Sequence, residues 1–132
     1  MSGYFLDTNI LTRFLLGDVT EQSLVVSKLF LEAKRKKIKL VAVPEVFIEL
    51  NYALKTHYGL EKDQIIDSIK NVLDFTFIEC TNKKTLTKAL SIFQEKNISL
   101  EDAYYISFSI DNDLDFYSFD KKALKVFKEI LA

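Results

Sequence analysis

The sequence predicts a helix-rich α/β protein with three layers, in which helices cover both faces of a central parallel sheet. Short apolar runs alternate along the chain with longer segments that carry apolar residues at helical spacing. The short runs are almost continuously apolar, as strands buried in a parallel sheet are. Only one proline and three glycines interrupt the chain, and no repeat or low-complexity segment is present. These observations together predict the fold class.

Each predicted strand is a short apolar run, rich in aromatic or β-branched residues. The four runs cover residues 4–6, 40–43, 75–78 and 115–119. The first and last runs each stop at a carboxylate, Asp7 and Asp120. A strand that delivers an acid to the start of a helix is typical of a binding site in an open α/β sheet.

The predicted helices are marked by capping and breaking residues. They cover residues 10–16, 20–37, 45–58, 61–73, 85–96, 100–112 and 121–131. Thr20 and Ser99 are suited to capping a helix start, and Pro44 to the first turn. Gly59 is expected to stop its helix in the left-handed conformation.

Composition limits what the protein can be. A length of 132 residues predicts a single domain, residues 1–132. The net charge of −1 does not indicate a nucleic-acid-binding protein, although a local basic face could still bind one. With Cys80 as the single cysteine, an intramolecular disulfide and a cysteine-rich zinc site are excluded, and the single His57 argues against histidine-dependent catalysis. We expect no membrane span and no signal peptide, and therefore a cytoplasmic protein.

A basic run, residues 34–39, closes the second predicted helix. Cations at a helix C-terminus complement the helix dipole, so we interpret this run as a solvated helix end. A role in gripping phosphates is the alternative.

Four acids occupy comparable places in the predicted fold. Asp7 and Asp120 follow strands, Glu49 lies one turn into the helix after the second strand, and Asp102 lies in the first turn of its helix. All of these points belong to the carboxyl edge of the sheet. Four carboxylates gathered there would repel one another unless a cation neutralised them. Oxygen ligands without histidine or cysteine suit Mg²⁺ or Mn²⁺.

Each of these acids also has a purely structural interpretation. Asp7 and Asp120 could be helix N-caps, and Asp102 could form a near capping box with Ser99. Glu49 could be paired with Lys55 or another base. The sequence leaves both interpretations open for each acid.

The order of the four acids and their neighbours resembles the PIN-domain family, in particular its VapC-type toxins. The matching segments are Phe5-Leu6-Asp7-Thr8-Asn9-Ile10-Leu11, Val43-Pro44-Glu45-Val46-Phe47-Ile48-Glu49-Leu50, Leu100-Glu101-Asp102-Ala103 and Ser118-Phe119-Asp120-Lys121. Two shorter segments also resemble the family: Leu16-Gly17-Asp18 and Tyr58-Gly59-Leu60. The resemblance spans nearly the whole chain.

The resemblance implies a PIN-like, Rossmann-like fold and a metal-dependent endoribonuclease that belongs to a toxin–antitoxin pair. It assigns to the acidic, Mg²⁺- or Mn²⁺-binding pocket the residues Asp7, Glu49, Asp102 and Asp120. Asn9 and Ser118 are the implied polar supports. It also implies a homodimer and an antitoxin partner. Many relatives carry a further acid where this chain has Ser99, which leaves the number of metal ions open.

Cations near the expected pocket could draw in the RNA backbone, and the closest in sequence are Arg13, Lys121 and Lys122. The alternative for Lys121 and Lys122 is that they are plain surface residues. The sequence disfavours two rival enzyme classes. A haloacid-dehalogenase-like phosphatase would need an acid in place of Asn9, and a receiver domain would need a phosphoacceptor Asp after residues 75–78, where Glu79-Cys80 stands. Two further functions stay open: a non-catalytic PIN-like binding module and a PIN nuclease outside toxin–antitoxin systems.

Overall fold

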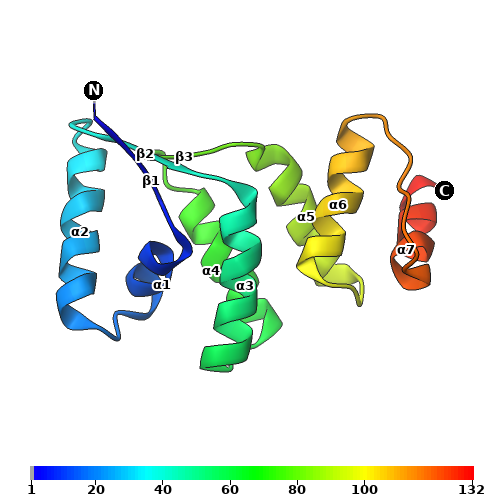
Figure 1. The fold of residues 1–132 in the computed structure, drawn as a ribbon, viewed down its shortest axis with the longest axis horizontal. Helices are drawn as coiled ribbons and strands as arrows, with labels where there is room; N and C mark the ends of the chain where they lie inside the picture. The colour runs from blue at the N-terminus through cyan, green and yellow to red at the C-terminus, as the bar shows by residue number, and fades with distance from the viewer. Residues whose placement is uncertain (1) are drawn as a thin grey trace. The chain divides into compact units, whose positions relative to one another are not determined.

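The computed structural model describes residues 2–132 and confirms the helix-rich α/β class with a parallel sheet. Within this part the chain forms three strands and seven helices (Figure 1). No helix among the described residues has both the length and the apolar composition that a membrane span requires. The chain divides after Thr81 into two compact units, which we name unit 1 and unit 2 (Asn82–Ala132).

Unit 1 contains the whole sheet. Its elements are β1 (Gly3–Phe5), α1 (Thr8–Leu16), α2 (Thr20–Lys34), β2 (Lys39–Ala42), α3 (Pro44–Tyr58), α4 (Lys62–Leu73) and β3 (Ile78–Cys80). The strands pair in parallel in the order β1-β2-β3, with Tyr4 opposite Leu40 and Leu40 opposite Ile78. Because the strands are parallel, β1 and β2 deliver the starts of α1 and α3 to the same edge of the sheet.

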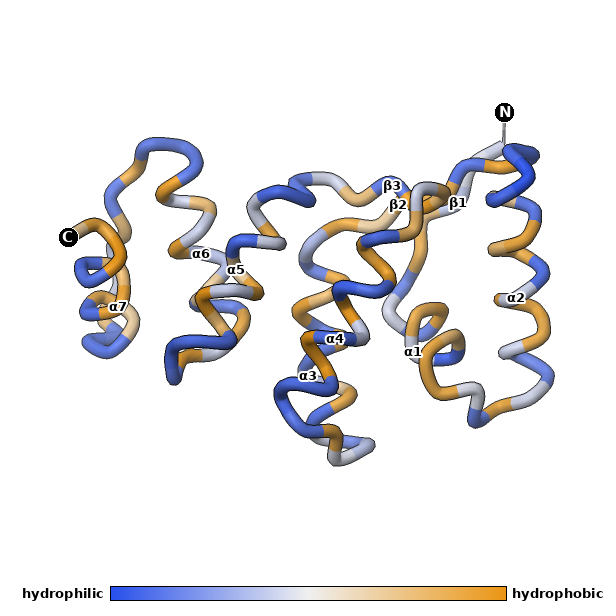
Figure 2. The backbone as a smooth tube through the Cα atoms, turned by 180° about the vertical axis from the view of Figure 1, so that it is seen from behind, coloured by the Kyte–Doolittle hydropathy of each residue, from blue (hydrophilic) through white to orange (hydrophobic). Residues whose placement is uncertain are grey.

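The core of unit 1 forms where helices pack on this sheet. Leu40 of β2 and Phe47 of α3 are fully buried, as is Ile66 of α4. Apolar and polar residues alternate along these helices (Figure 2), which is the pattern of helices with one buried side. α3 packs against α1 and α4, and this packing places Glu49 beside the start of α1.

Two boundaries in unit 1 differ from the predicted ones by three residues. The strand expected over residues 75–78 begins only at Ile78. Its aromatic residues instead stack, with the ring centroids of Phe75 and Phe77 4.9 Å apart, and pack against Phe14 and Phe30. Ring packing there replaces strand pairing. The second predicted helix, expected to reach residue 37, ends as α2 at Lys34.

Unit 2 is built from helices alone: α5 (Lys83–Glu95), α6 (Leu100–Asp111) and α7 (Lys121–Leu131). Its central apolar cluster joins α6 to α7 through Ile106, Val126 and Phe127. Phe116, from the segment before α7, packs against this cluster.

The fourth strand, predicted over residues 115–119, is wrong as a strand: the segment is irregular in the structure. Tyr117 and Phe119 are 93% and 96% exposed. A strand needs a neighbouring strand to accept and donate its backbone hydrogen bonds. Unit 2 offers none, so an apolar, aromatic sequence is not enough to make one here.

Candidate metal centre

Asp7 leaves β1 and occupies the N-cap position of α1. Its side chain makes no capping hydrogen bond, although its backbone carbonyl accepts one from the Ile10 N–H at 3.1 Å. The side chain is exposed. The structure therefore gives the Asp7 carboxylate no capping role, and its oxygens are available to a ligand at the carboxyl edge of the sheet.

Glu49 points from α3 toward the start of α1. The Thr8 hydroxyl donates a hydrogen bond to Glu49 Oε2 at 3.0 Å, and Thr8 is only 5% exposed. Thr8 directly follows Asp7, so this bond holds the Glu49 carboxylate beside the Asp7 position. Among the described residues Glu49 forms no ion pair, and the alternative pairing with Lys55 is not observed.

Thr8 is a positioning residue that the sequence did not reveal. Nothing in the local sequence indicates that Thr8 has a hydrogen-bond partner 41 residues away. A hydroxyl directly after a strand-ending acid is the one signal that could have drawn attention to it.

Asp102 lies in the first turn of α6, where Ser99 is the N-cap. The Ser99 hydroxyl oxygen accepts a hydrogen bond from the Asp102 N–H at 3.0 Å. The reciprocal bond from the Asp102 side chain, which would complete a capping box, is not formed within residues 2–132. Ser99 therefore does the capping, and the half-buried Asp102 carboxylate is uncommitted.

Asp120, in contrast, caps α7 with its side chain. Its Oδ1 atom accepts hydrogen bonds from the N–H groups of Lys122 and Ala123 at 3.0 and 3.1 Å. The Ser118 hydroxyl oxygen accepts a bond from the Asp120 N–H at 3.0 Å, which steadies the turn before the helix. One carboxylate oxygen of Asp120 is thus occupied by the helix, and Oδ2 is left for any further role.

The two predicted RNA-contacting cations differ in availability. Arg13 donates hydrogen bonds to Tyr58 Oη at 3.0 Å and to the Asp18 carboxylate, and its side chain is 15% exposed. The Tyr58 hydroxyl, followed by Asp18, raises the pKa of Arg13 above its usual value, against the opposing effect of burial. Arg13 therefore braces the α1–α2 turn against the end of α3, whereas Lys121 is exposed in the first turn of α7.

The four acids are shared equally between the units. Asp7 and Glu49 lie near each other in unit 1, while Asp102 and Asp120 belong to unit 2. In the part of the chain that the structure describes, no cluster of three or more Asp, Glu, His or Cys side chains could hold a metal ion. Asn9, the predicted polar support in unit 1, lines a groove between α1 and α2. The donors that are present, carboxylate oxygens without nitrogen or sulfur, match the preference of a hard divalent cation.

Comparison with known proteins gives the family. The sequence profile of the PIN domain matches residues 4–129. The chain is also similar to a VapC ribonuclease of Aquifex aeolicus (strain VF5), with 29% identity over 91 residues that cover 69% of this chain and 67% of that protein. No solved structure matches the chain. The PIN-domain match takes in most of β1 and most of α7, and it includes all four acids, so the chain belongs to the PIN domain family.

Proposed function

We propose that this protein is a divalent-metal-dependent endoribonuclease that hydrolyses RNA phosphodiester bonds. The observation that carries the proposal is the arrangement at the end of β1, where an uncommitted Asp7 adjoins the Thr8–Glu49 hydrogen bond. In a PIN-domain chain, such a pair of carboxylates supports a cation-binding edge. The similarity to a protein named VapC ribonuclease supports RNA as the substrate and a toxin–antitoxin pair as the setting.

The proposed ligands of Mg²⁺ or Mn²⁺ are Asp7, Glu49, Asp102 and Asp120. When bound, such an ion supplies positive charge that activates water and offsets the charge developing on the phosphate. The protein's part is to hold the oxygens: Thr8 orients Glu49, and Ser118 steadies the turn that carries Asp120. Asp7 stands at the N-terminus of α1, where backbone N–H groups favour a negative charge.

We further propose a homodimer, an antitoxin partner that blocks the acidic edge, and action in the cytoplasm. Of the two cations near the edge in sequence, Lys121 is the better candidate for contact with RNA. Arg13 would act indirectly, because its guanidinium is occupied by Tyr58 and Asp18.

The test is RNA cleavage by the purified full-length protein with Mn²⁺, with Mg²⁺ and with excess EDTA. We expect cleavage only with metal. Asp7→Asn should lower the rate at least about 100-fold, since even residues behind a metal ligand cost about 10- to 100-fold when lost. Asp67→Asn is the matched control, because Asp67 is an exposed acid on α4 that should leave the rate unchanged.

Cleavage that persists in EDTA or in Asp7→Asn, in a preparation free of other nucleases, would remove the metal mechanism. Protein that binds RNA but cleaves it under none of these conditions would instead be the non-catalytic PIN-like binding module.

A further inference from the structure

Four consecutive cations lie at the end of α2 and in the turn that follows it: Lys34, Arg35, Lys36 and Lys37. We name this group the basic end. All four side chains are exposed, and none forms an ion pair with any residue of the described chain. Lys39 is not included, because its ammonium lies 2.9 Å from the Glu79 carboxylate. A chain with a net charge of −1 thus concentrates unpaired positive charge in one place.

The basic end is not needed to satisfy the helix terminus. The last carbonyls of α2 accept backbone hydrogen bonds: Leu31 from Arg35, Ala33 from Lys36 and Glu32 from Lys37, at 2.9 to 3.0 Å. This is the backbone pattern of a Schellman motif, which caps a helix without side chains. The four side chains are therefore left to solvent or to a partner.

Lys36 occupies a backbone conformation that suits glycine better. Its φ is 62°, close to the φ of 60° at Gly17 and 65° at Gly59, which end α1 and α3. The other non-glycine residues with positive φ in the described chain are Asn82 and Asp113, of types that tolerate this region. A lysine there costs about 1 kcal/mol relative to glycine. Lys36 therefore stands at a position where glycine would fit the backbone better.

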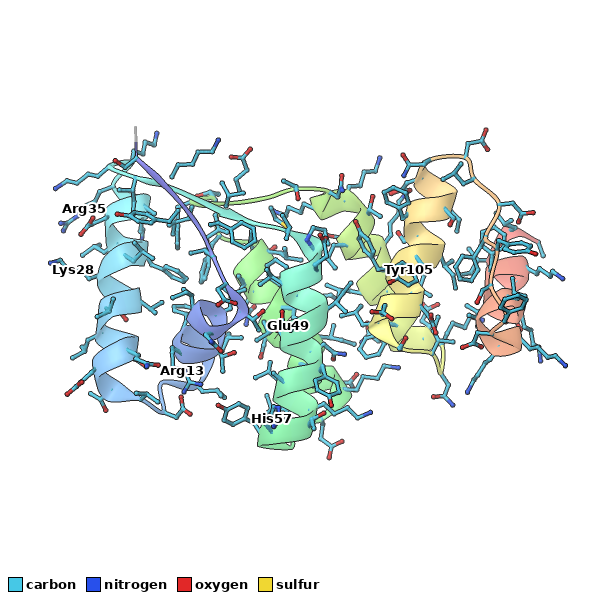
Figure 3. The ribbon with its side chains drawn as sticks, in the orientation of Figure 1. Arg13, Lys28, Arg35, Glu49, His57 and Tyr105 are labelled. Carbon is cyan, nitrogen blue, oxygen red and sulfur yellow. The ribbon has the colours of Figure 1, made fainter. Side chains whose placement is uncertain are left out.

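We propose that the basic end binds the phosphate backbone of RNA at a site distinct from the acidic edge. The proposal rests on the proposed function for the identity of the polyanion. Lys28 extends the site: it lies seven residues before Arg35, hence two turns away on the same side of α2, and Figure 3 shows both side chains pointing away from α1. A helix end and turn that present cations in several directions fit a string of phosphates better than a flat anionic membrane.

The basic end and the acids of unit 1 lie at opposite edges of the sheet. The basic end precedes β2, whereas Asp7 and Glu49 follow the ends of β1 and β2 (Figure 1). The four residues of β2 alone separate these edges by about 13 Å. An RNA that touches both is therefore several nucleotides long, so the basic end would favour long substrates over the shortest oligonucleotides.

The test measures how salt weakens binding of a fluorescent single-stranded RNA to the full-length protein in EDTA. The variant combines Lys34→Gln, Arg35→Gln and Lys37→Gln. We expect the slope of log K against log salt to flatten by about 0.7 per lost phosphate contact, so by about 2 in all. The control combines Lys55→Gln, Lys83→Gln and Lys128→Gln, three exposed lysines of α3, α5 and α7 that make the same change in net charge. It should keep the wild-type slope.

Lys36→Gly separates binding from folding. We expect it to raise the melting temperature, because glycine suits the left-handed position, and at the same time to weaken RNA binding several-fold at low salt. A change in stability with wild-type RNA affinity would mean that the helix end is merely solvated, and would overturn the proposal.

Two further results would overturn it: equal flattening in the control triple, or an unchanged slope in the basic-end triple. An unchanged slope accompanied by loss of binding to anionic lipid vesicles would assign the surface to membranes instead. These outcomes are independent of the nuclease assay. Flattening without any metal-dependent cleavage would sustain the RNA site and sink the proposed nuclease, while cleavage without flattening would do the reverse.

Discussion

The starts of α1 and α7 look alike in sequence but differ in the structure. For each, the sequence predicts an aspartate that ends a strand and opens a helix. Asp120 accepts two backbone hydrogen bonds and caps α7, whereas Asp7 makes no capping bond. The position of an aspartate at a helix start therefore does not show whether its carboxylate caps the helix or is available to a ligand.

The difference follows from what else holds each helix start. Before α1, the Leu6 N–H donates to the Val41 carbonyl at 2.8 Å, and Leu6 and Thr8 are buried. Before α7, the chain has no strand partner, and its exposed tip carries Phe119 in solvent. The side chain of Asp120 supplies there the anchorage that β1 supplies at Asp7.

The largest expected effect concerns metal binding. If Asp7 is available and ligates, Mn²⁺ at 100 times its dissociation constant should stabilise the wild type by about 2.7 kcal/mol. Asp7→Asn should lose most of this gain, and Asp120→Asn less, because one Asp120 oxygen serves the helix. The measurement is urea unfolding in EDTA and in Mn²⁺, with Asp67→Asn as the control. If the stability of the wild type is the same in EDTA and in Mn²⁺, the proposed metal site is wrong.

Removing each carboxylate without metal should give the next largest effect. Asp120→Ala should destabilise the protein by about 1 kcal/mol, the usual cost of losing an N-cap. Asp7→Ala should stay within about 0.5 kcal/mol, as substitutions on the surface usually do. Urea midpoints in EDTA measure both. Equal losses of stability in the two variants would show that the Asp7 side chain stabilises the fold as much as Asp120 does, and would contradict the difference drawn between them.

The smallest expected effect concerns a third acid, Asp111, whose carboxylate also has a structural role. Hydrogen bonds from Lys88 and Thr85 lower the pKa of Asp111 below its usual value. Because the folded pKa is the lower one, Asp111 contributes stability above the unfolded value of about 3.9 and loses it as pH falls through the folded pKa. Below about pH 4, wild type should therefore lose stability more steeply than Asp111→Asn. Urea midpoints at several pH values measure this loss. If wild type and Asp111→Asn lose stability in parallel, the hydrogen bonds from Lys88 and Thr85 to Asp111 do not stabilise the fold.

Local sequence determined most of the helices, because their signals act within a few residues. Pro44 opens α3 as predicted, and Gly59 ends it in the left-handed conformation. Ser99 caps α6 through the Asp102 N–H, as its position predicted. The strand–helix alternation of unit 1 was likewise readable, because continuous apolar runs are typical of buried parallel strands.

Tertiary structure decided the features whose partners lie far away in the chain. Residues 115–119 have the composition of a strand, but strand formation depends on a neighbour that sequence composition does not specify. Thr8 meets Glu49 only because the parallel pairing of β1 and β2 brings the starts of α1 and α3 together. The Asp7 carboxylate is likewise left without a capping role because β1 holds the start of α1. The local sequence pattern does not show this, since it is the same at Asp7 and at Asp120.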